Sequence, residues 1–334
     1  MIYIFFIGIA IISGILLTIA IRAYAVKYNI VNKPNPIVPQ HLKPVAYLGG
    51  GAIFLGILIC SGLAFFLQET ITYNIFSELK PVAAIACGCV LYLAWGIYDD
   101  LKQLKPLPKF LGQLFFSIVC VSLGIHTKMF GLPFMNYSFS IFWILFIVNA
   151  LNFTDVCDGL VASICAITFF LIGILSHESK IFSFIIAGAT TGFLFFNLPR
   201  ASIFLGDAGS HMLGFLLAAT AIMGSEKFSA VDSIIWMLFI SIVPVFELLF
   251  ITITRIKKGK QWWKGSPDHF SLRMQSAGFK RWQVDIIAAF ISAVFVAMAY
   301  SMPHMKNWLK YSLCAGTVII FGIAWKRLLK WEVK

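Results

Sequence analysis

The chain has 334 residues, of which 60% are hydrophobic and 12% are charged, and its mean hydropathy is +0.90. A soluble protein of this length would carry roughly twice that charged fraction, so the composition excludes a soluble globular protein. The formal net charge of +12 is compatible with anionic lipid headgroups and with a polyanionic substrate, and we expect no nucleic-acid partner.

Apolar runs of about 17 to 25 residues recur along the chain, each long enough to cross a bilayer as a helix. They lack the alternating pattern of a membrane barrel, so we expect an all-α polytopic membrane protein, with 1–334 as a single transmembrane domain. About ten or eleven spans are expected, at 2–22, 46–66, 81–98, 109–125, 138–152, 159–176, 181–197, 209–224, 233–254, 283–302 and 308–325.

The first apolar stretch, 2–21, has no basic residue before it and no small-residue cleavage site, so we interpret it as a retained span. With eleven spans, 20 of the 26 Lys and Arg residues fall on one side. The positive-inside rule makes that side cytoplasmic and places the N-terminus outside and the C-terminus inside. The seven cysteines mostly lie within apolar runs, which indicates buried free thiols.

Aspartates gather on the predicted cytoplasmic face. Asp99, Asp100, Asp155, Asp158 and Asp207 come from three separate loops and stand at or just beyond span ends. One such residue would be an ordinary helix cap or a solvated acid, but five indicate a shared site. We expect the active site to form from the loops at about 23–45, 99–108, 153–158, 198–208 and 255–282.

The first two acids are adjacent in "GIYDDLKQLKPLPKF". Neighbouring positions on a helix point about 100° apart, so one carboxylate can face a metal or a reacting oxygen while the other braces a cation. Repulsion between Asp99 and Asp100 favours a proton on one of them, which suits a proton acceptor. Lys109, at the start of the next span, is placed to meet phosphate oxygens.

The segment "NALNFTDVCDGL" carries Asn149, Asn152, Asp155 and Asp158 at intervals of three residues. Oxygen donors of this kind suit Mg²⁺ or Mn²⁺ rather than zinc. Gly159 then allows a backbone or a ligand to approach closely.

In "FNLPRASIFLGDAGSHMLGF" a turn of small residues precedes a new span. The N–H groups at that helix start form a natural phosphate site, and Asp207 there predicts a divalent cation between carboxylate and phosphate. His211 is expected to have a structural role.

The basic loop 255–282 is compatible with a lipid-facing amphipathic segment. Its "SPDHFSLRM" stretch nevertheless places His269 and Arg273 four residues apart, where the pair could hold a phosphate or diphosphate. Glu247 is the only acid well inside a span, and we expect it to pair with a basic group from another loop.

These motifs resemble those of the polyprenyl-phosphate N-acetylhexosamine-1-phosphate transferases (glycosyltransferase family 4), which include undecaprenyl-phosphate GlcNAc-1-phosphate transferases and phospho-MurNAc-pentapeptide transferases. The resemblance extends from about residue 32 to 282. It adds the first loop, "NKPNPIVPQHLKPVAYLGGGAIF", with His41 and Gly49-Gly50 in register.

The resemblance implies a Mg²⁺-dependent enzyme of the bacterial cytoplasmic membrane, whose site faces the cytoplasm. It would transfer a sugar 1-phosphate from a UDP-N-acetylhexosamine to undecaprenyl phosphate and release UMP. In that reading Asp99 is the base, supported by Asp100, and Asp207 is the metal ligand, with Asn152 a second. The substrate-contacting or organising residues would be Lys109, Asp155, Asp158, Gly159, Asn197, His269, Arg273 and His41. A homodimer is compatible with the sequence.

The sequence departs from the family pattern in three places. Val38, Pro39 and Gln40 replace a basic pair before His41, Val156 and Cys157 replace Gly-Leu, and a His-rich motif is reduced to His269. The loop that carries the His-rich motif helps select the sugar in the family, so the last change favours UDP-GlcNAc or a related UDP-N-acetylhexosamine, with UDP-MurNAc-pentapeptide as the alternative donor. A secondary transporter is the alternative of another class, but we find no internal repeat and only Glu247 deep in a span.

Overall fold

The computed structural model describes residues 2–32, 43–67, 79–176, 179–261 and 263–333. Within them, the chain forms thirteen α-helices and a two-stranded antiparallel sheet of β1 (Val31–Asn32) and β2 (Val45–Ala46). The helices are α1 (Ile2–Lys27), α2 (Gly49–Phe66), α3 (Leu79–Lys102), α4 (Pro106–Ser122), α5 (Pro133–Thr154), α6 (Leu160–Leu175), α7 (Lys180–Asn197), α8 (Gly206–Ser225), α9 (Ala230–Ile240), α10 (Ile242–Lys257), α11 (Phe270–Ser276), α12 (Arg281–Ser301) and α13 (Asn307–Lys330), with a 3-10 turn η1 (Met302–His304).

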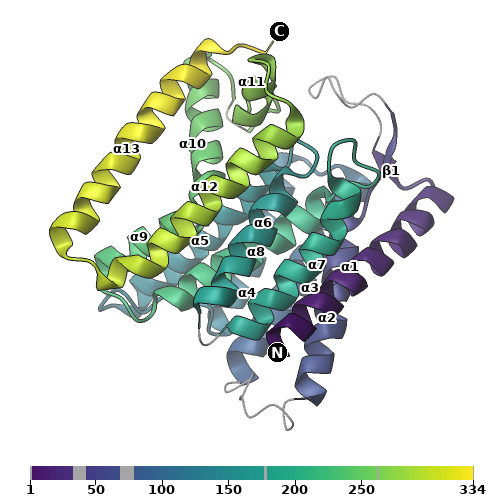
Figure 1. Cartoon of the computed structure of the whole chain (residues 1–334), viewed down its shortest axis with the longest axis horizontal. Coiled ribbons are helices and arrows are strands. Elements are labelled where there is room, and N and C mark those ends of the chain that lie inside the picture. Colours follow the sequence, from purple (N-terminus) through teal and green to yellow (C-terminus); the bar gives the residue numbers. More distant parts are fainter. Residues whose placement is uncertain (1, 33–42, 68–78, 177–178, 262, 334) are drawn as a thin grey trace.

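The predicted all-α polytopic architecture is confirmed. Each expected span coincides with one helix or, at 233–254, with the pair α9 and α10. Within the described ranges, eight helices are long and apolar enough to cross a membrane, whereas α4 and α6 are apolar but shorter. The total of eleven spans therefore stays a prediction. The two termini lie at opposite ends of the bundle (Figure 1), and which end faces the cytoplasm also stays a prediction.

The span expected at 233–254 differs most from a straight helix. Helices α9 and α10 are bent by 82° at Ser241. Pro244 explains the break, because it has no N–H to donate to the carbonyl of Ile240 and its ring would collide with that carbonyl in a continuous helix.

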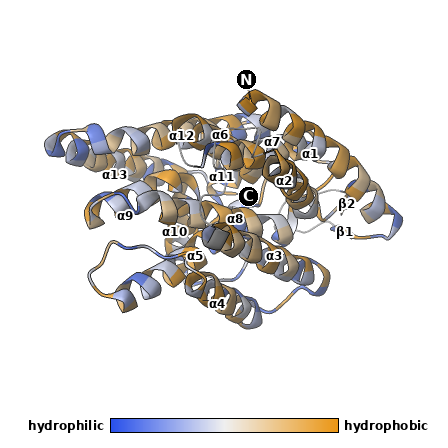
Figure 2. Ribbon diagram, turned by 90° about the horizontal axis from the view of Figure 1, so that it is seen from below, coloured by the Kyte–Doolittle hydropathy of each residue, from blue (hydrophilic) through white to orange (hydrophobic). Residues whose placement is uncertain are grey.

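Helix α8 forms the centre of the bundle and packs against α2, α3, α5 and α9. In the most apolar stretch of α8, 83% of the residues are buried, against 6% in the corresponding stretch of the peripheral α13. Hydrophobic residues run along most of the helices and hydrophilic ones gather at helix ends and in loops (Figure 2). Large apolar side chains such as Leu16 and Ile319 point outward, 60% and 63% exposed, as expected for lipid-facing positions.

The start of α8 is fixed by close backbone contacts. The amides of Gly49 and Gly50 donate to the carbonyls of Phe204 and Leu205, both at 3.0 Å. On α3, Gly96 lies against the backbone of Asp207 and Ala208, where a Cβ atom would collide. Small residues at these contacts bring the first loop, the end of α3 and the start of α8 together.

We predict that Gly96→Ala lowers the stability of the purified protein by about 1–3 kcal/mol, because the added methyl must displace the backbone of α8. Thermal unfolding in detergent measures this change. Gly62→Ala on α2 is the control, since no atom lies within 4 Å of a Cβ built there. Equal melting temperatures for the two variants would contradict the close α3–α8 contact.

Candidate active site

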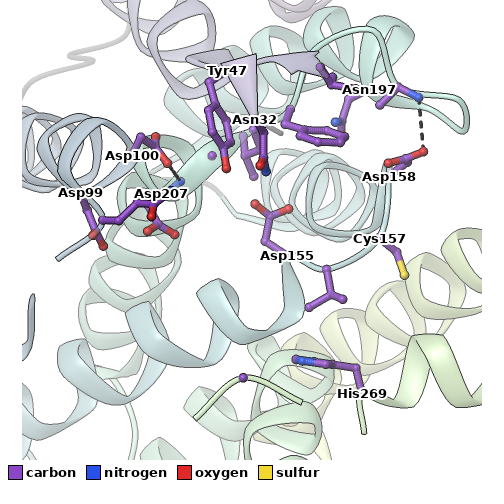
Figure 3. A pocket seen from close by; sticks show the side chains of 18 of the residues that line it. Asn32, Tyr47, Asp99, Asp100, Asp155, Cys157, Asp158, Asn197, Asp207 and His269 are labelled. Carbon is purple, nitrogen blue, oxygen red and sulfur yellow. Dashed lines mark hydrogen bonds between the residues drawn. The ribbon is translucent and has the colours of Figure 1, made fainter. Parts of the chain in front are cut away.

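One large cavity, of about 1070 Å³, opens at the end of the bundle where α3, α5 and α8 meet (Figure 3). All five loops that the sequence predicts for the active site contribute to its wall. The lining residues are Asn32, Lys43, Val45, Tyr47, Asp99, Asp100, Gln103, Leu104, Lys109, Asp155, Val156, Cys157, Asp158, Asn197, Arg200, Ala201, Phe204, Leu205, Gly206, Asp207, Gly265, His269 and Arg281. The predicted convergence of the five aspartates is confirmed.

Lys109 lies among Asp99, Asp207 and Asn152 at one end of the cavity, which we call the acidic end. Its Nζ lies 2.8 Å from Asp99 Oδ2, 2.9 Å from Asp207 Oδ2 and 3.4 Å from Asn152 Oδ1. These residues come from α3, α4, α5 and α8, so a single ammonium group joins four helices. Because the site is largely shielded from water, the attraction is stronger than that of a surface pair.

Asp207 and Asp99 are each held by further contacts. Asn152 Nδ2 donates to Asp207 Oδ1 at 2.5 Å and to Ser210 Oγ at 3.0 Å. The Leu104 amide donates to Asp99 Oδ1 at 2.8 Å. Both oxygens of Asp99 are therefore engaged, and its side chain is only 4% exposed.

Asp100 has a different position from Asp99. Its two carboxylate oxygens accept from the amides of Asp207 at 2.8 Å and Ala208 at 3.1 Å, so it caps the start of α8 from a neighbouring helix (Figure 3). The prediction that this helix start offers free N–H groups to a phosphate is wrong for these two amides. A carboxylate of the chain takes them instead.

Asp155 points into the middle of the cavity (Figure 3). Among the residues that the structure describes, its carboxylate has no hydrogen-bond or ion-pair partner. Burial raises the pKa of Asp155 well above its usual range, and nearby carboxylates, Asp207 first, raise it further. This carboxylate is therefore suited to accept and hold a proton.

The opposite side of the cavity is organised by Asp158 and Asn197. Asp158 Oδ2 accepts from Arg281 Nη1 at 2.9 Å. Asn197 Oδ1 accepts from the Gly159 amide at 3.0 Å, and its Nδ2 donates to the Ile203 carbonyl at 2.9 Å. Gly159 has φ +80°, and a Cβ there would lie 3.0 Å from Asp285 Oδ2. The hydrogen bonds of Asn197 thus join the loop that ends at Gly159 to the loop that contains Ile203.

His269 and Arg273, the pair predicted in the loop 255–282, lie in different surroundings. His269 lines the cavity, and its Nδ1 lies 2.6 Å from Glu247 Oε1, so the predicted pairing of Glu247 with a basic group is confirmed. Arg273 does not line the cavity; its guanidinium contacts Asp268 Oδ1 at 2.7 Å and the Leu328 carbonyl at 3.0 Å. His41 lies outside the described residues.

The cavity wall also contains residues that the motifs did not single out. Lys43 and Arg200 are exposed cations from two of the predicted loops, and the basic count of those loops is the signal that could have identified them. Burial, followed by the negative charge of Asp100, raises the pKa of Tyr47, so its phenol is a neutral donor. Burial also raises the pKa of Cys157 to about 12, so its thiol stays protonated.

The acidic end fits a hard divalent cation. Asp99 and Asp207 offer carboxylate oxygens within 4.8 Å of one another, and Asn152 adds an amide oxygen on the same side. Carboxylate and amide oxygens are donors that Mg²⁺ and Mn²⁺ prefer. The ammonium of Lys109 shows that this position favours positive charge.

A hydrogen-bonded chain fixes the tautomer of His211. Asn149 Nδ2 donates to the Leu145 carbonyl and to Gln113 Oε1, both at 2.8 Å. Gln113 Nε2 must therefore donate to His211 Nε2, at 3.2 Å. The ring proton is left on Nδ1, so that nitrogen cannot ligate a metal. The structural role expected for His211 agrees with this arrangement.

Residues 82–225 match the family model described as Glycosyl transferase family 4. The matched segment contains Asp99, Asp100, Lys109, Asn152, Asp155, Asp158, Asn197 and Asp207. His269 and Glu247 lie beyond it.

Full-length relatives agree with this match. A Bacillus subtilis (strain 168) protein named probable undecaprenyl-phosphate N-acetylglucosaminyl 1-phosphate transferase is 29% identical, over 94% of this chain and 89% of its own length. A Mycobacterium tuberculosis (strain ATCC 25618 / H37Rv) decaprenyl-phosphate N-acetylglucosaminephosphotransferase is 26% identical, over 85% and 78%. A Leuconostoc mesenteroides phospho-N-acetylmuramoyl-pentapeptide-transferase is 29% identical, over 73% and 81%.

We predict that Asp100→Asn lowers both stability and activity, because the amide keeps one acceptor oxygen but loses the other and the charge. The expected stability loss is about 1 kcal/mol, as for other helix caps. Ser229→Ala is the matched control: it removes a cap from α9, where Ser229 Oγ accepts from the Asp232 amide at 3.3 Å, far from the cavity. Thermal unfolding and turnover are measured together. A similar stability loss with unchanged turnover in both variants would contradict the role of Asp100 in holding Asp207.

Proposed function

We propose that this chain, which belongs to glycosyl transferase family 4, transfers an N-acetylhexosamine 1-phosphate from a UDP-sugar to undecaprenyl phosphate. In this reaction an oxygen of the lipid phosphate attacks the sugar-bearing phosphorus. The bond from that phosphorus to UMP breaks, and undecaprenyl-diphospho-sugar and UMP are the products. The observation that carries the proposal is the cavity at a helix-bundle end whose acids surround one lysine. The names of the relatives support the same class of reaction.

We assign the cation site to Asp207, Asn152 and Asp99, whose oxygens already converge on the Lys109 ammonium. Mg²⁺, or Mn²⁺ in its place, would neutralise diphosphate charge and polarise the phosphorus–oxygen bonds when bound. Phosphoryl transfer asks the protein mainly for alignment and positive charge, which this end of the cavity supplies.

Lys109 has two available roles, since its ammonium holds Asp99 and Asp207 together and can contact a phosphate oxygen that enters between them. The family resemblance implies that Asp99 is the base. Because both oxygens of Asp99 are engaged while those of Asp155 have no partner among the described residues, we place proton acceptance from the lipid phosphate on Asp155. Lys43 and Arg200, exposed on the cavity wall, supply positive charge for the donor's phosphates.

We propose UDP-GlcNAc or a related UDP-N-acetylhexosamine as the donor, and undecaprenyl-diphospho-sugar as the start of a cell-envelope glycan. His269, the one histidine among the described residues that line the cavity, and two relatives whose names carry N-acetylglucosamine support this choice. UDP-MurNAc-pentapeptide remains the second candidate, supported by the name of the third relative.

We also propose that the chain lies in the bacterial cytoplasmic membrane with the cavity facing the cytoplasm. The chain is a multi-pass membrane protein, and in the predicted eleven-span arrangement 20 of its 26 basic residues fall on the side that carries the cavity loops.

The direct test incubates purified protein with undecaprenyl phosphate, Mg²⁺ and a panel of UDP-N-acetylhexosamines that includes UDP-MurNAc-pentapeptide. We expect UMP release and a lipid-linked sugar with UDP-GlcNAc or a close analogue, and loss of both on chelation of the metal. Asp207→Asn should lower turnover by about 100-fold or more, because it removes charge from the cation site.

Glu226→Gln is the control variant. Its partner Lys128 is 64% exposed, so the pair contributes little to stability, and it lies away from the cavity. Absence of UMP with every donor would overturn the proposed function. Turnover by Asp207→Asn equal to that of Glu226→Gln would overturn the assignment of Asp207.

A further inference from the structure

Glu247 is a buried acid that the mechanism above does not use. It lies on α10 with 1% of its surface exposed. Its Oε1 lies 2.6 Å from Nδ1 of His269, and its Oε2 accepts from the Phe270 amide at 3.2 Å. Both oxygens thus engage the segment that brings His269 to the cavity, and the positive charge of Arg255 acts on Glu247 from the same helix.

These contacts fix the hydrogen-bond polarity of the His269 ring. A carboxylate only accepts hydrogen bonds, so Nδ1 of His269 must carry a proton to bind Glu247. In the neutral ring the other nitrogen, Nε2, then has a free lone pair. His269 lines the cavity while Nδ1 is held from behind by Glu247, so Nε2 is the ring nitrogen left for a substrate.

The segment around His269 is also anchored on its other side. Asp268 Oδ1 contacts Lys258 Nζ at 2.6 Å and Arg273 Nη2 at 2.7 Å. Arg273 Nη1 in turn donates to the Leu328 carbonyl at the end of α13, at 3.0 Å. Burial tends to raise the pKa of Asp268, but the Lys258 hydrogen bond and the other contacts outweigh it and lower that pKa. The backbone of His269 is therefore held, and Glu247 sets the direction of its ring.

We propose that Glu247 is a positioning residue for donor recognition. It keeps the proton on Nδ1 of His269 and presents Nε2 as an acceptor for a hydroxyl or N–H group of the nucleotide-sugar. This inference rests on the proposed function and assigns a role to a residue outside the acidic cluster. The sequence predicts that His269 contacts a phosphate, whereas we assign to it an uncharged group of the donor.

The first experiment compares Michaelis constants for the two substrates. In Glu247→Gln the side-chain amide can donate to Nδ1, which moves the ring proton to Nε2 and removes the acceptor. We expect the KM for the UDP-sugar to rise about tenfold, as for loss of one buried hydrogen bond. The KM for undecaprenyl phosphate and kcat should change less than threefold. Thr254→Val is the matched control on α10, because the Thr254 hydroxyl is buried and has no partner among the described residues.

The second experiment tests whether Glu247 acts through His269. In a double-mutant cycle, Glu247→Gln combined with His269→Ala should raise the donor KM no further than His269→Ala alone. His269→Gln, which keeps a polar group near the Nε2 position, should retain a lower donor KM than His269→Asn, which does not. The comparison of the two His269 variants holds even if Glu247→Gln fails to fold.

Inhibition by UMP shows which part of the donor His269 contacts. An unchanged inhibition constant in Glu247→Gln places the contact on the sugar, and a raised one places it on the nucleotide.

Additive effects in the cycle, a shift in the KM for the lipid, or equal donor KM values for His269→Gln and His269→Asn would each overturn the role of Glu247. Those results require wild-type turnover, so they leave the proposed function intact. Absence of turnover by the wild type with every donor overturns the function and the inference together.

Discussion

The arrangement of the whole site depends on one electrostatic constraint: several carboxylates must share a small volume at the end of an apolar helix bundle. Lys109 offsets two of these charges directly, through Asp99 and Asp207. Asp100 is stabilised by two backbone amides at the start of α8, and Asp155 by a raised affinity for protons. These four acids are therefore stabilised in three different ways, and the contacts of Lys109 and Asp100 hold α3, α4, α5 and α8 together at this end of the bundle.

The cavity has a different character at its two ends, and this difference suits a substrate with both a diphosphate and a neutral sugar. Asp99, Asp207 and Asn152 surround a position that favours positive charge. On the far wall, Asp158 is paired with Arg281. His269 enters from the segment before α11, anchored by Glu247. In the proposed reaction the phosphates lie toward the first group, while the uncharged part of the donor reaches His269.

Much of this could be predicted from the sequence. Apolar runs of bilayer length gave the positions of the helices, and charge at span ends indicated that Asp99, Asp155 and Asp207 share one face. The direction in which a side chain points could not be predicted in the same way. Asp100 faces the amides of α8, and Arg273 turns to the end of α13, because these depend on helices that are distant in sequence. The bend at Ser241 could have been predicted from Pro244, a residue well inside an expected span.

The claim on which the proposed chemistry depends is that the oxygens around Lys109 form a divalent-cation site. Electron paramagnetic resonance of Mn²⁺ added to the purified protein measures this binding directly, without turnover and without a donor sugar. We predict saturable Mn²⁺ binding to the wild type that Mg²⁺ displaces, and its loss in Asp207→Asn with a native melting profile. Equal Mn²⁺ binding by the wild type and Asp207→Asn, or none by either, would contradict the claim.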